Sequence, residues 1–218
     1  MSATQLSKLS RGIKSSFERR PPILNTIKNE RENMLQSIQL VHDCMIAGNL
    51  GVIETNLGPD VNEAVKYLDQ IRSNRRKRQA FLKELEQIGE EEYSLVSEDA
   101  QVPTSKRKPV KKEIVGTWKK LPKHLFGSFR PILDMNDACV ARTRLLVLTC
   151  EILRMGKQNK SYPDDLGAFG KEIATDPYSG ALFPYKADQA EFKLYSVGPN
   201  GRDDGGDTDE AYTAPDMK

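Results

Sequence analysis

The chain has few of the residues on which metal and catalytic sites most often depend. It contains three cysteines, two histidines and one tryptophan among 218 residues. The cysteines form no CxxC pair and have no histidine pair nearby, so neither a zinc site nor a disulfide framework is expected. His42 and His124 are isolated from each other and from any nucleophile at useful spacing. We expect Cys44, Cys139 and Cys150 to act as small buried hydrophobic residues.

Long apolar runs and catalytic motifs are missing as well. The longest apolar run covers residues 145–150, far below the roughly 20 residues that cross a bilayer. The first 20 residues are basic and rich in serine, without the apolar segment of a secretory signal. A glycine-rich phosphate loop, a GxSxG motif and an HExxH motif are absent from the sequence. These absences predict a soluble protein that is not an enzyme and has no small-molecule substrate.

Apolar and aromatic residues are scarce for a chain of this length. Apolar residues make up 38% and aromatic residues 7%, whereas 29% of the residues are charged. Part of the chain is therefore expected to be extended or weakly packed. Basic residues outnumber acidic ones up to residue 130, and the balance reverses from Pro131 onward. This asymmetry predicts two modules with different surroundings.

The first half of the chain is expected to be helical after a short arm. Residues 1–22 are predicted to be a basic mobile arm that ends at a Pro-Pro pair. Apolar residues then recur at helical spacing from Ile23 to about Ala47. Asp60 is predicted to cap a second helix of some thirty residues, which ends in the glutamate-rich region at 90–92. Together these segments define a helical module over residues 23–98.

The second half is predicted to combine one long helix with a small sheet. Residues 99–130 read as a charged linker that contains prolines. A helix of about 26 residues is expected from Pro131, followed by a hairpin of Ala181–Lys186 and Glu191–Val197. A helix and a hairpin can bury a shared apolar face. The predicted fold class is therefore α+β, with a helical N-terminal module and a domain at 131–218 in which one long helix packs on a small antiparallel sheet.

Several motifs follow the long helix in order. The helix runs into Arg-Met-Gly-Lys-Gln-Asn-Lys-Ser-Tyr-Pro-Asp-Asp-Leu at 154–166, and the turn Thr-Asp-Pro-Tyr-Ser-Gly occupies 175–180. A Pro-Tyr strand comes next, then Phe-Lys-Leu-Tyr-Ser-Val-Gly-Pro-Asn-Gly-Arg-Asp-Asp-Gly-Gly-Asp at 192–207. From about residue 138 to residue 209, this order resembles the C-terminal domain of the type II secretion major pseudopilins.

The resemblance implies a structural role. In that family the Tyr-Pro corner ends the long helix, the Asp-Pro-x-x-Gly turn opens the sheet, and the Tyr-Ser-x-Gly segment leads into a calcium-binding loop. We therefore expect a bacterial, non-catalytic structural or assembly protein with protein partners. The leader and hydrophobic helix of the family are not found here. Either the chain is the distal part of a longer protein, tethered at the periplasmic face of the inner membrane through an upstream segment, or the domain serves as a soluble module.

An acidic loop near the C-terminus supplies the candidate metal ligands. Glycines bend this loop and four aspartates gather within seven residues. Calcium takes six to eight oxygen ligands from carboxylates, amide oxygens and carbonyls, and the resemblance points first to Asn200 and to Asp207 or Asp209. The candidate calcium ligands are Asn200, Asp203, Asp204, Asp207 and Asp209. The other interpretation is a solvated acidic turn that binds no ion.

Two basic clusters support an alternative function. Residues 75–78 and 106–108 are runs of lysine and arginine, and Lys111 and Lys112 extend the second run. Clustered positive charge is sufficient for phosphate binding, so a basic helical adaptor could bind nucleic acid or an acidic partner through residues 72–112. The first cluster shares its predicted helix with many glutamates and few aromatic residues. A solvated helix face is favoured there, and nucleic acid is not the expected partner.

Overall fold

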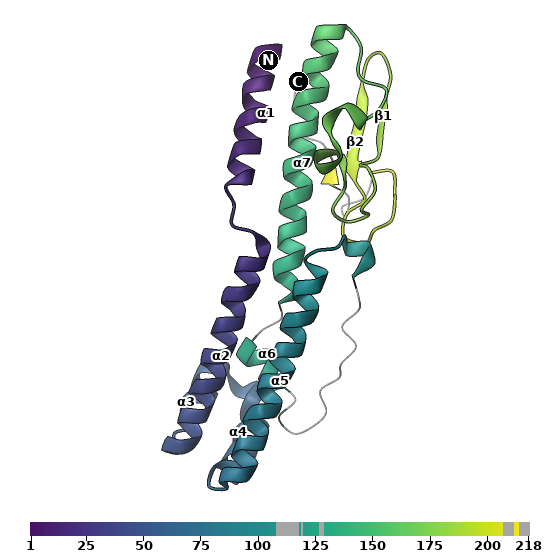
Figure 1. The fold of residues 1–218 in the computed structure, drawn as a ribbon. Helices are drawn as coiled ribbons and strands as arrows, with labels where there is room; N and C mark the ends of the chain where they lie inside the picture. The colour runs from purple at the N-terminus through teal and green to yellow at the C-terminus, as the bar shows by residue number, and fades with distance from the viewer. Residues whose placement is uncertain (108–117, 119, 127–128, 207–211, 214–218) are drawn as a thin grey trace. The chain divides into compact units, whose positions relative to one another are not determined.

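The computed structural model describes residues 1–107, 118, 120–126, 129–206 and 212–213 (Figure 1). The described chain is mostly helical with a small antiparallel sheet, which confirms the predicted α+β class. It divides into two compact units. The α+β unit consists of Met1–Pro21, Gln101–Arg107 and Leu133–Lys218. The helical unit consists of Pro22–Ala100 and Lys108–Ile132.

The helical unit is built from two long helices and several short ones. Its elements are α2 (Ile23–Ala47), α3 (Gly51–Leu57), the 3₁₀ turn η1 (Pro59–Val61), α4 (Asn62–Arg72), α5 (Arg75–Asp99) and α6 (Leu121–Phe126). The bounds of α2 match the prediction. A left-handed Gly48 (φ 71°) ends this helix and its N–H donates to the Cys44 carbonyl, a helix ending that glycine adopts without a Cβ penalty.

The second predicted helix is two helices. The prediction of one helix from Asp60 is wrong, because Asp60 lies inside η1 and the chain breaks again between Arg72 and Arg75. The Asn74 side chain accepts a hydrogen bond from the Lys77 N–H at 3.1 Å and caps α5. This cap satisfies one of the N–H groups left without a partner at a helix start.

Apolar helix faces form the core of the helical unit. Met34 of α2, Leu68 of α4 and Leu85 of α5 are almost fully buried. The Phe81 and Trp118 rings meet edge to face with their centroids 5.1 Å apart. At Gly89 of α5, an added Cβ would collide with the Met34 side chain, so glycine at this position allows α2 and α5 to approach closely.

The α+β unit contains one long helix and the sheet. Its elements are α1 (Ala3–Glu18), the 3₁₀ turn η2 (Thr104–Lys106), most of α7 (Arg130–Asn159), η3 (Gly167–Phe169), α8 (Lys171–Ala174), β1 (Tyr185–Ala187), β2 (Phe192–Ser196) and β3 (Tyr212–Thr213). The long helix was predicted from Pro131 to Gly156, and α7 extends three residues beyond that end. The predicted hairpin is confirmed with shorter strands.

The sheet has the order β1-β2-β3 with antiparallel pairing throughout its described strands. In the hairpin Tyr185 pairs with Leu194, and Ala187 pairs with Phe192. Figure 1 shows the hairpin lying alongside α7. Leu145, Leu148 and Ile152 of α7 share a buried cluster with Phe183, Leu194, Leu166 and Ala174. One helix therefore supports the hairpin, as the prediction required.

The first residues form a helix and not a mobile arm. Ser2 and Gln5 make a reciprocal capping box at the start of α1, and Leu6 is 1% exposed. Arg20, just beyond α1, donates to the Cys139 sulfur of α7 at 2.9 Å. Figure 1 shows the start of α1 beside the C-terminal end of α7, so the two helices are antiparallel.

The predicted linker is also divided differently. Residues 101–107 belong to the α+β unit, whereas α6 belongs to the helical unit. The expectation of one continuous linker over 99–130 is therefore wrong, because both pieces are packed against folded structure.

Within the described residues, every helix is too short or too polar to cross a membrane.

Candidate functional site

The turn at 175–180 is held by a buried carboxylate. Asp176 is 0% exposed. Its Oδ1 accepts hydrogen bonds from the Tyr178 N–H and the Ser196 hydroxyl, both at 3.0 Å, and its Oδ2 accepts one from the Val197 N–H at 2.9 Å. The Gly180 N–H closes the turn by donating to the Asp176 carbonyl at 2.8 Å. One side chain thus joins the turn to the end of β2.

The electrostatics of this carboxylate reflect its burial. Burial raises the pKa of Asp176, because desolvation disfavours the charged form, while the hydrogen bonds from Tyr178, Val197 and Ser196 oppose the rise. Arg144 of α7 adds a favourable charge, and its guanidinium donates to the Thr175 carbonyl at 2.7 Å. The polar groups around Asp176 therefore bind one another and keep the turn close to the long helix.

A second contact joins the Tyr-Pro corner to the hairpin. The Tyr185 hydroxyl donates to the Pro163 carbonyl at 2.9 Å, and the rings of Tyr162 and Phe192 meet edge to face at 5.1 Å. Burial raises the pKa of Tyr185 to about 12. An added Cβ at Gly156 would meet the Tyr162 ring at 2.7 Å. Gly156, where the predicted helix ends, therefore leaves room for the Tyr162 ring that closes the corner.

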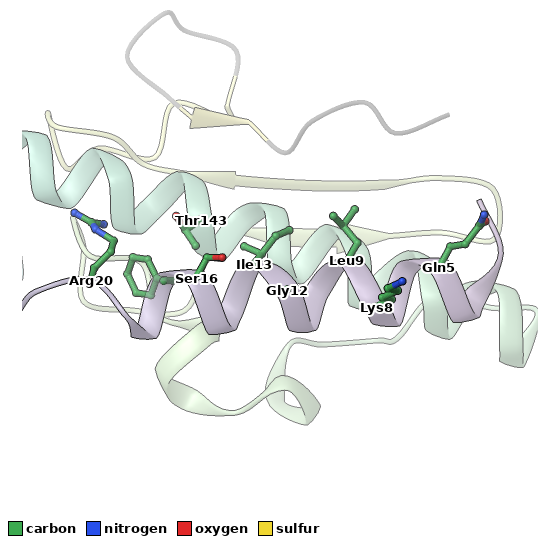
Figure 2. Close-up of a pocket in the computed structure, with 9 residues that line it drawn as sticks. Gln5, Lys8, Leu9, Gly12, Ile13, Ser16, Arg20 and Thr143 are labelled. Atoms are coloured by element: carbon green, nitrogen blue, oxygen red, sulfur yellow. The ribbon is translucent and has the colours of Figure 1, made fainter.

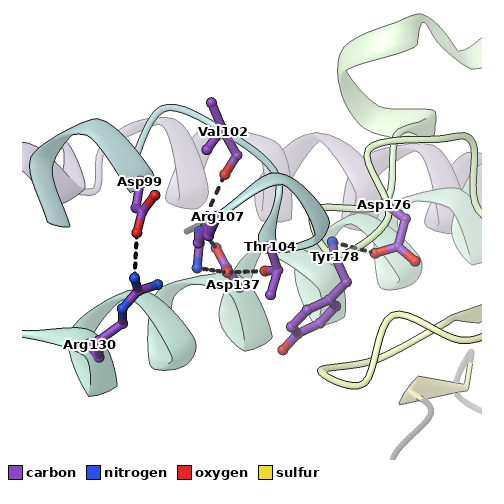
Figure 3. Close-up of polar contacts among 8 residues, drawn as sticks. All are labelled: Asp99, Val102, Thr104, Arg107, Arg130, Asp137, Asp176 and Tyr178. Carbon is purple, nitrogen blue, oxygen red and sulfur yellow. Dashed lines mark hydrogen bonds and ion pairs between the residues drawn. The ribbon is translucent and has the colours of Figure 1, made fainter. Parts of the chain in front are cut away.

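Residues 101–107, which we call the strap, are bound to α7 by a buried ion pair. Arg107 and Asp137 approach within 2.6 Å with side chains only 6% and 5% exposed. Asp137 also accepts from the Thr104 hydroxyl at 2.8 Å. Figure 3 shows Arg107 between this carboxylate and the Val102 carbonyl. Buried charges of this kind are tolerated when they are paired and hydrogen-bonded.

The strap also contacts the Asp176 turn. The Thr104 N–H donates to the Pro177 carbonyl at 3.2 Å, and the Ser105 N–H donates to the Tyr178 carbonyl at 2.9 Å. Asp137 thus holds the strap on α7, and Asp176 holds the turn that the strap contacts. In the helical unit, Asp99 and Arg130 form a comparable pair at 2.6 Å (Figure 3).

Sequence reasoning missed these anchors. Asp137 lies on the buried face of α7, four residues after Leu133 and four before Ala141. A charged residue on an otherwise apolar stripe indicates that a partner must come from elsewhere, and this signal was present in the sequence. The Asp-Pro turn carried a comparable signal, because aspartate often accepts a hydrogen bond from the backbone two residues later.

The described part of the acidic loop is bonded internally. Asp203 accepts from the Tyr195 hydroxyl at 2.7 Å and from the Gly205 N–H at 3.1 Å. The Tyr195 hydrogen bond lowers the pKa of Asp203. The Asn200 amide donates to Asp204 at 3.0 Å, and its oxygen accepts from the Arg202 N–H at 2.9 Å. These bonds shape the turn around Asn200, Asp203 and Asp204.

The predicted calcium ligands are therefore only partly placed. Asn200, Asp203 and Asp204 lie in one loop, but Asp207 and Asp209 fall outside the described residues. In the part of the chain that the structure describes, no group of three or more His, Cys, Asp or Glu side chains is arranged to hold a metal ion. The three described residues use side-chain oxygens for internal hydrogen bonds. Calcium binding by this loop stays a prediction.

The basic clusters differ in exposure. Arg75, Arg76 and Lys77 are exposed at the start of α5. Arg107 instead belongs to the buried pair with Asp137, so the central residue of the basic run at 106–108 is not available to a partner. Among the other basic residues nearby, Arg72 pairs with Asp69 at 2.6 Å. The adaptor hypothesis therefore retains a smaller basic surface than the sequence indicated.

Comparisons of the chain with models of known protein families, with curated proteins and with solved structures gave no significant match.

Proposed function

We propose that this chain is a non-catalytic structural or assembly protein, with a pseudopilin-like α+β unit and a helical unit that binds protein partners. One observation carries the proposal. The motifs that resemble the pseudopilins are separated in sequence, yet they contact one another through their characteristic residues. Asp176 of the Asp-Pro turn binds Ser196 and Val197 of the Tyr-Ser-Val-Gly segment, and Tyr185 of the Pro-Tyr strand binds Pro163 of the Tyr-Pro corner.

These contacts favour a structural role for the motif residues. A catalytic carboxylate must reach a reacting group, at hydrogen-bond distance or through one water. Asp176 is fully buried and accepts bonds on both oxygens from its own chain. Asp137 is similarly occupied by Arg107 and Thr104. Asp137 fixes the strap onto α7 and Asp176 fixes the turn to the end of β2, and such fixed loops suit a rigid module for assembly.

Calcium stabilisation of the acidic loop is a second part of this proposal and rests on the resemblance. Asn200 and Asp204 lie at the start of the loop, and Asp207 and Asp209 follow it in sequence. A calcium ion bound there would replace the Asn200–Asp204 hydrogen bond with shared coordination by oxygen atoms. The ion would lower the repulsion among the aspartates and hold the chain that leads to β3.

The assembly role is tested by the size of the complex that the chain forms. Sedimentation of a tagged chain in an extract of the cells that produce it should show a species well above 24.5 kDa, the mass of one chain. Cross-linking before lysis should preserve the same species. Asp176→Ala should reduce this species, because the turn and β2 lose their shared anchor, whereas Asp164→Ala at an exposed position should not. A chain that sediments only as a 24.5-kDa species contradicts the proposal.

The calcium part is tested separately by thermal unfolding. Millimolar calcium should raise the melting temperature of the wild-type chain, and magnesium should raise it less because magnesium prefers small octahedral sites. Asn200→Ala combined with Asp209→Ala should abolish the calcium-induced rise. An equal rise in this double variant would reject these two ligands while leaving the assembly role intact.

A further inference from the structure

An open groove runs along α1 in the α+β unit. It has a volume of about 720 Å³ and is lined by one face of α1 together with Thr143 of α7 (Figure 2). Leu9, Ile13 and Phe17 supply its apolar surface, and Leu9 is 38% exposed. The same helix buries Leu6 on another side. Helix α1 is thus packed on the side of Leu6 and leaves apolar surface exposed on the side that lines the groove.

The dimensions of the groove suit another helix. Its lining extends along α1 from Gln5 to Phe17, which at 1.5 Å per residue is about 18 Å, or just over three helical turns, and Arg20 lines it beyond the end of the helix. The groove is open near its middle, because a Cβ added at Gly12 would meet no atom within 4 Å. A large apolar side chain of a partner can therefore sit over Gly12, between Leu9 and Ile13.

The charge along the groove has one sign. Lys8 and Arg20 are the charged residues among those that line it. Arg20 is held in place by the Cys139 sulfur at 2.9 Å and lies 5.3 Å from the centre of the Phe17 ring. Arg11 and Lys14 add positive charge on α1, and Glu18 is its acidic residue. A partner with acidic side chains beside an apolar stripe complements this surface.

We infer that this groove binds an acidic amphipathic helix of a partner protein. The inference rests on the proposed assembly function and names the chemistry of the partner. In this recognition mode, apolar residues at i, i+3, i+4 and i+7 fill a hydrophobic groove while flanking charges fix the register. A groove that runs along one helix fits another helix better than it fits a flat bilayer, so the partner is a helix and not a membrane.

The experiment uses the full chain and a defined probe. The probe is a fluorescent 16-residue helical peptide with leucines on one face and glutamates on both sides of that face. One control peptide replaces each glutamate with lysine, and a second keeps the composition but scatters the leucines around the helix. Fluorescence anisotropy should show that the chain binds the acidic peptide at least about tenfold more tightly than either control, and more weakly at high salt.

Substitutions in α1 then locate the site. Gly12→Leu should abolish binding, because its side chain fits the fold but occupies the groove, and circular dichroism should show an unchanged helix content. Ser15→Leu is the matched control, because it adds the same side chain at an exposed position that does not line the groove. Lys8→Glu with Arg20→Glu should weaken binding at least about tenfold, whereas Lys157→Glu, exposed on α7, should not.

Some results would overturn the inference. Equal affinity for the acidic and lysine peptides, or binding that survives Gly12→Leu, would reject the groove as an acidic-helix site. Binding to vesicles of one-third phosphatidylglycerol in phosphatidylcholine that depends on Lys8 and Arg20, without peptide binding, would identify a lipid surface instead. If the groove fails these tests while large complexes persist in cell extracts, the assembly role stands and only this docking site is rejected.

Discussion

The two units of this protein are stabilised by different kinds of interaction. In the helical unit, the described core consists mainly of apolar helix faces such as those of Met34, Leu68 and Leu85, beside the ion pair of Asp99 with Arg130. In the α+β unit, an apolar cluster between α7 and the hairpin is supplemented by buried carboxylates, Asp137 and Asp176, which hold the strap and the Asp-Pro turn.

This difference determines how each unit should respond to substitution. Apolar burial is distributed over many side chains and depends mainly on volume. A buried carboxylate gathers several hydrogen bonds on one residue, and its loss leaves donors buried without a partner. We therefore expect single polar substitutions to disrupt the α+β unit more than the helical unit. Trp118 is the single tryptophan of the chain and lies in the helical unit, so its fluorescence reports on that unit.

The largest expected effect is that of Asp176→Ala. The Tyr178 and Val197 N–H groups and the Ser196 hydroxyl would lose their acceptor. At about 1–3 kcal/mol for each unsatisfied buried group, partly offset by relief of carboxylate burial, the α+β unit should lose about 4 kcal/mol. The loss of unfolding free energy is measured by a urea titration in which amide hydrogen exchange of residues 133–206 is monitored. A simultaneous, equal shift in Trp118 fluorescence would contradict independent stabilisation of the units.

Leu85→Ala tests how the helical unit depends on its apolar core. Leu85 is 0% exposed in the helical unit, and truncation of a buried leucine to alanine costs about 3 kcal/mol through lost burial and a residual cavity. The urea midpoint reported by Trp118 fluorescence should fall, while exchange in the α+β unit stays unchanged. Leu85→Met is the matched control, because it conserves volume and should cost less than about 1.5 kcal/mol.

Arg107→Met should detach the strap. The buried Asp137 would lose its cation, yet the strap can lift and allow that carboxylate to hydrate, so the cost should be about 2 kcal/mol and smaller than that of a pair that cannot open. The measurement is amide exchange at Thr104 and Ser105, whose N–H groups donate to the Asp176 turn. Unchanged protection of these two amides would show that the ion pair does not hold the strap.

Gly89→Ala should have a smaller effect on the helical unit. The new Cβ collides with the Met34 side chain, which costs about 1–3 kcal/mol, while replacing glycine in a helix recovers up to about 1 kcal/mol. The net loss should be about 1 kcal/mol by Trp118 fluorescence. In a Met34→Ala background the same substitution should become neutral or stabilising, because the collision is removed.

The smallest effect concerns pH. Burial raises the folded-state pKa of Asp176 above 3.8, its ordinary value, so the part of the stability that is linked to this shift is full below the unfolded pKa and is lost as the pH rises through the folded pKa. The difference in unfolding free energy between the wild type and Asp176→Asn should therefore shrink as the pH rises across this window. The pKa of Asp203 is shifted in the opposite direction. Its effect on stability cancels in this comparison, because both chains contain Asp203. A difference that grows with pH would contradict the assignment.

The parts of the fold that depend on periodicity could be predicted from the sequence. The bounds of α2, the long helix and the hairpin all follow from apolar spacing and turn residues. The break before α5 was missed because apolar residues resume at Phe81 after a short charged stretch, although the Asn74 side chain caps the new helix. Helix α1 was missed because its serines and basic residues resemble those of a mobile arm, while its capping box and apolar spacing indicate a helix.

The candidate site was predictable only where its residues lie close together in the sequence. The Asp-Pro turn and the acidic loop are continuous segments, and Asn200, Asp203 and Asp204 do share one loop. The pairing of Arg107 with Asp137 joins residues 30 positions apart, and sequence spacing does not indicate such a partner. For the same reason, the exposed basic run expected at 106–108 could not be recognised as partly buried.

The most direct test of this account is amide exchange at Tyr178 and Val197, measured by NMR in the wild type and in Asp176→Ala. Both N–H groups donate to the Asp176 carboxylate in the folded chain. If this residue joins the Asp-Pro turn to the end of β2, both amides should exchange at least about 100-fold faster in the variant, while amides of α2 and α5 keep their protection. Unchanged exchange at Val197 would show that the end of β2 is held by something else, and the structural role assigned to these motifs would be wrong.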